Sequence, residues 1–122
     1  MYAQPIMATT TKKPTLTKLE EQFIIAFYSS VEDTLNYSRV SDVHMAGLTT
    51  NQVKGVFGSL VAKGVFKPDA DMYEGNGESY ETIGMTDLLS NEEMNEIAKK
   101  YGMYFDFEDM DYDYLKPLTK TK

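Results

Sequence analysis

Apolar residues recur at intervals of three and four positions in three stretches of this sequence, and each stretch predicts an amphipathic helix. The helices begin at Thr17, at Thr49 or Thr50, and at Ser90, because hydroxyl side chains cap helix N-termini. Their apolar stripes are Leu19, Phe23, Ala26, Phe27 and Val31; Val53, Val56, Phe57, Leu60 and Val61; and Met94, Ile97, Ala98 and Tyr101. Glutamate three positions after Thr17 and after Ser90 completes a capping box in the first and third helices.

The residues between the first two of these helices predict two short elements. Residues 37–40, Tyr-Ser-Arg-Val, have the composition of a short strand. Ser41 then caps an expected brief helix that contains Val43 and Ala46. Gly47 ends this helix, because glycine readily adopts the left-handed conformation found at helix C-termini.

A β-hairpin is predicted over residues 68–85. Asn76-Gly77 favours a tight two-residue turn, in which both central residues have positive φ, and Gly75 favours a bulge or a longer loop. Gly64 and Gly102 each follow a predicted helix and mark its end. The order helix, short strand, helix, helix, hairpin, helix predicts an α+β fold that is mainly helical.

The chain is expected to fold as one domain, since its 122 residues match the size of a single core. Residues 1–15 are expected to be a flexible polar leader, and residues 16–102 the folded domain. Residues 103–122 form a separate acidic and aromatic C-terminal segment.

The sequence resembles winged helix-turn-helix proteins in two runs. Residues 47–53, Gly-Leu-Thr-Thr-Asn-Gln-Val, and residues 60–66, Leu-Val-Ala-Lys-Gly-Val-Phe, are similar to the recognition helix of bacterial MarR-like regulators and its exit into the wing. Residues 54–60, Lys-Gly-Val-Phe-Gly-Ser-Leu, also resemble small winged-helix proteins of bacteriophages and mobile elements. The resemblance covers residues 17–85 and implies a three-helix core with a β-hairpin wing. Residues 90–102 add a C-terminal helix.

The resemblance implies binding to double-stranded DNA, with the third helix of the core in the major groove. Asparagine and glutamine recognise adenine edges, whereas threonine, lysine and arginine suit phosphates. The DNA-binding residues implied are Thr49, Thr50, Asn51, Gln52, Lys54, Arg39 and Lys63. A phage-type transcriptional regulator acting as a homodimer, in the cytoplasm of a bacterium or a phage-infected cell, is the function expected.

Three features depart from the family pattern. The second helix is shorter than usual, which leaves its orientation open. The outward face of the third helix carries Gly55, Gly58 and Ala62, where a strong DNA reader presents longer polar side chains. The wing is acidic, whereas wings that touch phosphates tend to be basic.

Charge also opposes DNA binding and supports a competing hypothesis. The net charge of −7 is uneven: residues 1–67 carry seven Lys or Arg against five acids, and residues 68–122 carry five Lys against fourteen acids. Nucleic-acid affinity depends largely on neutralised phosphates, which the acidic second half would repel. The alternative is a protein-interaction module, or a DNA-mimic inhibitor, that uses the acidic wing and tail on a basic partner surface.

The segment 103–115 is the most unusual part of the sequence, with five acids, five aromatic rings and no base. It is expected either to dock on a partner, to cover the third helix as an autoinhibitor, to remain a disordered tail, or to pack on its own domain or within a dimer. If it docks on a partner, the residues expected to make contact are Tyr104, Phe105, Phe107, Asp109, Asp111 and Tyr112.

Catalytic, metal and cofactor sites are not expected. Cysteine is absent and His44 is the single histidine, so nucleophile–base pairs built on these residues are nearly excluded. Asp109, Asp111 and Asp113 alternate as in an EF-hand, but Tyr114 occupies the position that requires glycine. No apolar stretch reaches the ~20 residues of a membrane span.

Overall fold

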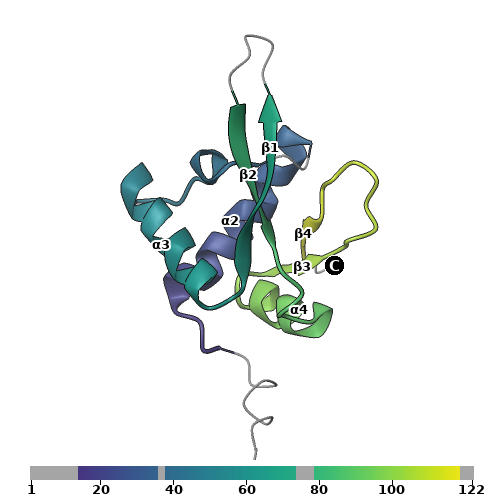
Figure 1. Ribbon diagram of the computed structural model, residues 1–122. Coiled ribbons are helices and arrows are strands. Elements are labelled where there is room, and N and C mark those ends of the chain that lie inside the picture. The colour runs from purple at the N-terminus through teal and green to yellow at the C-terminus, as the bar shows by residue number, and fades with distance from the viewer. Residues whose placement is uncertain (1–13, 36–37, 74–78, 119–122) are drawn as a thin grey trace, which may run out of the picture.

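Three α-helices and two small antiparallel sheets make up the part of the chain that the computed structural model describes, residues 14–35, 38–73 and 79–118. In chain order the elements are α2 (Lys18–Thr34), the 3₁₀ turn η1 (Val40–Asp42), α3 (Thr50–Ala62), β1 (Phe66–Tyr73), β2 (Ser79–Met85), α4 (Asn91–Lys100), β3 (Met103–Phe105) and β4 (Leu115–Pro117). Helix α2 passes behind the β1–β2 hairpin, with α3 on one side and α4, β3 and β4 on the other (Figure 1). The expected α+β class is confirmed in this broad sense.

The predicted helix starts are confirmed, and each has a complete capping box. The Thr17 hydroxyl accepts from the Glu20 backbone N–H at 3.1 Å, while Glu20 Oε1 accepts from the Thr17 N–H at 2.8 Å. Ser90 and Glu93 repeat this arrangement at α4. At α3 the cap is Thr49 rather than Thr50, and the glutamine at position 52 replaces the glutamate.

The helix ends also follow the sequence pattern. Gly64 after α3 and Gly102 after α4 adopt φ values of 81° and 74°, in the region that favours glycine. Helix α2 is longer than its fading apolar pattern suggested, since it continues to Thr34 and ends at Leu35, which has φ 57°.

The expected brief helix over Val43 to Gly47 is wrong. The chain forms only the single turn η1, whose start is fixed by the Arg39 N–H donating to Asp42 Oδ2 at 2.8 Å. Ser41 is exposed and lies inside this turn instead of capping a helix. A segment this short gains too few hydrogen bonds to offset helix nucleation, so local side-chain bonding decides its shape.

The expected strand over residues 37–40 is also not formed. Tyr37 lies outside the described residues, and Val40 already belongs to η1. One strand-like bond remains, because the Ile83 N–H of β2 donates to the Ser38 carbonyl at 2.9 Å.

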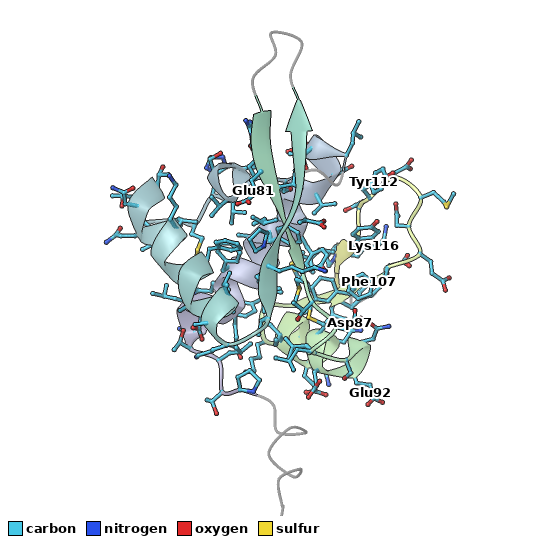
Figure 2. All side chains as sticks on the ribbon, viewed as in Figure 1. Glu81, Asp87, Glu92, Phe107, Tyr112 and Lys116 are labelled. Atoms are coloured by element: carbon cyan, nitrogen blue, oxygen red, sulfur yellow. The ribbon has the colours of Figure 1, made fainter. Side chains whose placement is uncertain are left out.

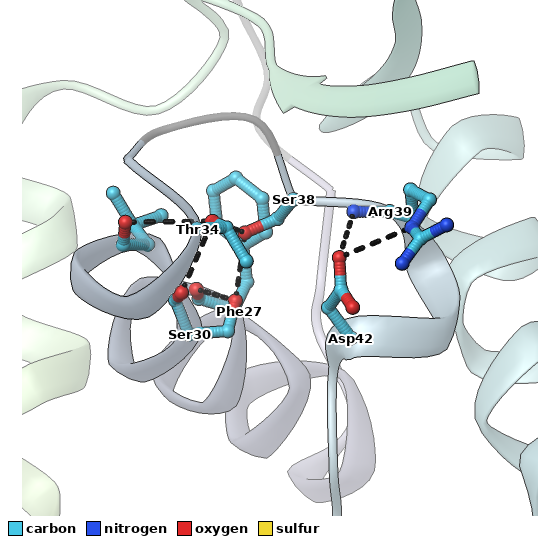
Figure 3. A network of polar contacts seen from close by, with 7 residues as sticks. Phe27, Ser30, Thr34, Ser38, Arg39 and Asp42 are labelled. Carbon is cyan, nitrogen blue, oxygen red and sulfur yellow. Dashed lines mark hydrogen bonds and ion pairs between the residues drawn. The ribbon is translucent and has the colours of Figure 1, made fainter. Parts of the chain in front are cut away.

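A small polar network fixes this connection to the end of α2 (Figure 3). Ser38 is 1% exposed, and its hydroxyl lies 2.9 Å from the hydroxyls of both Ser30 and Thr34. Buried polar groups need such partners, since an unpaired hydroxyl costs about 1–3 kcal/mol. The network therefore holds residues 38–42 between α2 and the sheet.

The predicted hairpin is present as the antiparallel pair β1–β2, with Phe66 opposite Met85 and Tyr73 opposite Ser79. The turn residues Asn76-Gly77 and the bulge expected at Gly75 lie outside the described residues. An irregularity occurs instead between Pro68 and Asp71. Proline has no N–H for the ladder, and it is commonly found at such points.

The core lies where α2, α3 and the hairpin meet. The Phe66 ring of β1 contacts Phe23 and Phe27 of α2 edge-on, with both centroid distances 5.1 Å. Leu60 of α3 is fully buried beside them, whereas Val61, assigned to the same stripe from the sequence, is exposed.

Residues 103–118 continue the same core. Phe105 of β3 and Leu115 of β4 are buried, and the two strands pair with Phe105 opposite Leu115. The Asn95 side chain of α4 accepts from the Phe105 N–H at 2.8 Å. These two strands had no counterpart in the sequence analysis, because three residues are too few to show a period.

Candidate nucleic-acid interface

The N-terminal half of α3 presents an exposed polar face. Thr49, Thr50, Asn51, Gln52 and Lys54 are all exposed. Two of them are partly engaged in the cap, since the Thr49 hydroxyl and Gln52 Oε1 accept backbone N–H groups. Within the described part of the chain, Asn51 and Lys54 make no hydrogen bond or ion pair, so both side chains are available to a ligand.

Helix α3 contains no acidic residue, and Lys54 is its single charged residue. Gly55 and Gly58 leave open space on the helix surface, because a Cβ placed at either position would meet nothing within 4 Å. The face is therefore polar, shallow and weakly positive, which suits close approach of a phosphate backbone but supplies few charges of its own.

Lys63 lies in a structural contact. Its ammonium donates to Glu20 Oε1 at 2.6 Å and to the Thr15 carbonyl at 2.7 Å. Glu20 is 3% exposed and also accepts from the Ser59 hydroxyl at 2.6 Å. Burial alone would raise the pKa of Glu20, but the hydrogen bonds from Lys63, Ser59 and Thr17 outweigh it and hold the pKa below its ordinary value. A phosphate would have to compete with this carboxylate for Lys63.

Arg39 lies in the connection before η1, which packs against α3. Its Nε lies 3.4 Å from Asp42 Oδ2, and its side chain is 40% exposed. The guanidinium is thus near the helix but shares its charge with a neighbouring carboxylate. Of the seven DNA-binding residues expected from the sequence, Thr50, Asn51 and Lys54 have side chains that make no hydrogen bond or ion pair within the described part of the chain.

The acidic and aromatic segment lies on the other side of the hairpin from α3, against α2 and α4 (Figure 1). It does not lie across Asn51 and Lys54, as autoinhibition would require. Its aromatic residues pack on the domain instead, where the Tyr28 ring of α2 contacts Phe105 and Phe107 at centroid distances of 5.0 and 5.7 Å.

The residues expected to contact a partner differ in accessibility. Tyr104 and Asp111 are exposed, whereas Phe107 and Tyr112 are half-buried and Phe105 belongs to the core.

Asp109 is engaged within its own segment, and Lys116 donates to its carboxylate at 2.7 Å. This bond, together with the Asp111 N–H, lowers the pKa of Asp109. The segment is therefore an internally bonded loop with a few free carboxylates.

Among the described residues, no three histidine, aspartate or glutamate side chains are grouped as a metal ion would require. None of the helices in this part of the chain has both the length and the apolar character needed to cross a bilayer.

Comparisons with protein-family models, curated proteins and solved structures found no match to this chain.

Proposed function

We propose that this protein is a small DNA-binding protein of the winged-helix type, with the first turns of α3 in the major groove. The observation that carries the proposal is the free polar face of α3. Asn51 and Lys54 are exposed and unengaged on a helix without acids, and the acidic segment lies on the other side of the hairpin. Asn51 would read a base edge, and Lys54 would contact a phosphate.

The arrangement of α2, α3 and the β1–β2 hairpin supports the winged-helix assignment. In this interpretation α3 is the recognition helix and the hairpin is the wing. The family's second helix is reduced here to η1 and an extended connection, held by the network around Ser38. The resemblance to MarR-like and bacteriophage proteins makes transcriptional regulation in a bacterial or phage-infected cytoplasm the proposed role, with a homodimer reading two half-sites.

The electrostatic contribution is expected to be small. Lys54 is the one base in α3, and Lys63 and Arg39 are shared with carboxylates. With two or three phosphate contacts, affinity for duplex DNA should fall about 10- to 40-fold between ~50 and ~200 mM salt, far less than for strongly basic DNA-binding domains.

The test is a titration of labelled duplex DNA at about 50 mM salt, where phosphate contacts are strongest. Lys54→Ala should weaken binding to all sequences and reduce the slope of log affinity against log salt by about one unit. Asn51→Ala should reduce affinity for the preferred sequence about 5- to 150-fold and relax specificity at one position.

Lys99→Ala is the matched control, because Lys99 is an exposed lysine at the far end of α4. It removes the same charge from a different face. Absence of binding by the unmodified protein would overturn the proposal. Equal losses in Lys54→Ala and Lys99→Ala would show that α3 is not the DNA-binding face.

A further inference from the structure

Two adjoining hollows open beside the C-terminal segment, away from α3. Their volumes are about 490 Å³ and about 280 Å³, and they share Tyr28, Met85 and Phe107. The smaller hollow is also lined by Asp69 and Tyr114, and the larger one by Asp87. We call the two together the aromatic cleft, defined by the rings of Tyr28, Phe107 and Tyr114 and the carboxylates of Asp69 and Asp87 (Figure 2 labels Phe107 and Asp87).

The rings of the cleft are held in place by contacts with one another and with the buried Phe105 ring. Phe107 stacks on the buried Phe105 ring, with centroids 5.0 Å apart and planes 6° from parallel. Tyr28 lies 5.7 Å from Phe107 and 6.1 Å from Tyr114, crossing each at about 70°. Because Phe105 covers one face of Phe107, a ligand would meet the opposite face and the edge. The cleft therefore offers a preformed aromatic wall.

Three polar groups of the cleft, the carboxylates of Asp69 and Asp87 and the hydroxyl of Tyr28, have no partner among the described residues. Asp69 and Asp87 are exposed carboxylates without a hydrogen bond or ion pair there, and the Tyr28 hydroxyl is likewise unpaired. The Asp69 carboxylate lies directly over Gly84, where an added Cβ would come within 3.1 Å of Oδ2. Glycine at this position leaves room for the carboxylate against the strand.

The charge of the cleft has one sign. Neither hollow is lined by a lysine, arginine or histidine. The nearby Lys116 is already committed, with its ammonium 2.7 Å from Asp109 and 3.8 Å from Asp113. Exposed Glu92 lies on α4, on the same side of the hairpin as Asp87 and Phe107 (Figure 2), and exposed Lys67 lies on β1 opposite Gly84. The charged residues that line the hollows themselves are all acidic.

We propose that the aromatic cleft binds the guanidinium group of an arginine side chain on a protein partner. Aromatic faces attract cations through the ring quadrupole, and the planar guanidinium both stacks on rings and donates to carboxylates. Asp69 and Asp87 supply acceptors in the two hollows, and the Tyr28 oxygen supplies another. The negative charges of Asp69 and Asp87 would favour encounter with a basic protein segment. The site is independent of α3 and of DNA binding.

The test uses three synthetic tripeptides with arginine, lysine or citrulline between two glycines, titrated into the full chain and followed by the ring-proton NMR signals of the aromatic residues. Citrulline keeps the shape of arginine without its charge. The arginine peptide should bind at least five-fold more tightly than either of the others and should shift the signals of Tyr28, Phe107 and Tyr114. Equal binding of citrulline would overturn a cation site, and equal binding of lysine would overturn the arginine assignment.

Single substitutions test whether the peptide binds in the aromatic cleft. Asp69→Asn and Asp87→Asn should each weaken the arginine peptide several-fold, whereas Glu108→Gln removes the same charge from an exposed residue that lines neither hollow and should have no effect. Phe107→Leu keeps apolar bulk without the aromatic face and should abolish the preference for arginine. Equal losses in Glu108→Gln and the two aspartate variants would overturn the proposal in favour of general attraction by an acidic surface. The aspartate variants keep this comparison decisive even if Phe107→Leu fails to fold.

Discussion

Replacing Glu20 removes a carboxylate that ties the first turn of α2 to the last turn of α3. The residue is 3% exposed, and its carboxylate accepts from three donors, the Thr17 backbone, the Ser59 hydroxyl and the Lys63 ammonium, all within 2.8 Å. Glu20→Gln keeps an acceptor for the capping box but loses the charge, whereas Glu20→Ala removes every contact.

The magnitude follows from the exposure of the partners. A hydrogen bond to a charged group contributes about 1.5–3 kcal/mol when both partners are buried. The Lys63 side chain is 30% exposed and the Thr17 backbone is near the surface, so both can be hydrated in the variants. Each contact is then worth about 1 kcal/mol. We expect Glu20→Ala to lower the free energy of unfolding by about 2–3 kcal/mol, and Glu20→Gln by about 1 kcal/mol.

The assay is urea unfolding followed by circular dichroism at neutral and acidic pH. Because the folded-state pKa of Glu20 is below its ordinary value of 4.5, its charge stabilises the fold above that pH. This contribution is lost as the pH falls through the lowered pKa. The difference between the unmodified protein and Glu20→Gln should therefore be full near neutral pH and should vanish well below 4.5.

Glu32→Gln is the matched control, since Glu32 is an exposed glutamate on the same helix. It should change the unfolding free energy by less than about 0.5 kcal/mol. A double-mutant cycle with Lys63→Met isolates the pair and should give a coupling of about 1 kcal/mol. The reasoning is refuted if Glu20→Ala resembles Glu32→Gln, or if the Glu20→Gln difference persists unchanged in acid.

Three further predictions concern other parts of the fold. Gly64→Ala should lower the free energy of unfolding by about 1 kcal/mol, because residue 64 has φ 81°. Gly58→Ala inside α3 should instead raise it by about 0.5–1 kcal/mol. Urea unfolding would contradict this if both variants changed the free energy of unfolding in the same direction. Asn95→Ala should cost about 1–2 kcal/mol and accelerate hydrogen exchange at the Phe105 N–H, which loses its acceptor. Burial, with a smaller effect of Tyr114, raises the pKa of Tyr28 to about 12. An ultraviolet titration should therefore show one tyrosine that ionises at unusually high pH, and Tyr28→Phe should remove it. Because the unfolded chain ionises first, the free energy of unfolding should fall as the pH rises from about 10 to about 12. Unchanged titration curves for the two proteins would refute that assignment.

The elements that were predictable from the sequence are those determined by residues a few positions apart. Thr17 with Glu20, and Ser90 with Glu93, form their capping boxes as expected, because the partners are three residues apart on one chain segment. The glycine at position 64 marks the end of α3 for the same reason.

The parts that could not be predicted depend on partners far away in the sequence. Lys63 was expected on DNA, but its ammonium pairs with Glu20, 43 residues earlier, and nothing local indicates that contact. Leu19 was assigned to the buried stripe and is 45% exposed, while the neighbouring Glu20 faces inward to reach α3. Helix periodicity alone cannot determine which edge of a stripe is covered.

Only one part of the aromatic cleft could be predicted from the sequence. The density of rings in residues 103–115 was evident, and packing on the chain's own domain was one of the alternatives. The other half is Tyr28, a residue of α2 that lies outside the predicted apolar stripe. Its ring is the surface on which Phe105 and Phe107 assemble, so the site could be recognised only after α2 and β3 were placed together.

The position of the C-terminal strands has a consequence for the order in which the molecule opens. Residues 103–118 contact α2 through a few aromatic rings. Helix α4, just before them, is joined to α2 by the ion pair between Lys100 and Glu21, which are 79 residues apart. The Phe23, Phe27 and Phe66 cluster is formed by α2 and the hairpin, and Phe57 of α3 packs against it. Because few contacts hold residues 103–118 on α2, we expect this segment to open locally at a lower free energy than the rest of the core. Local opening of residues 103–118 would then disrupt the aromatic cleft while α3 remains folded, so the two faces of this domain would open at different rates.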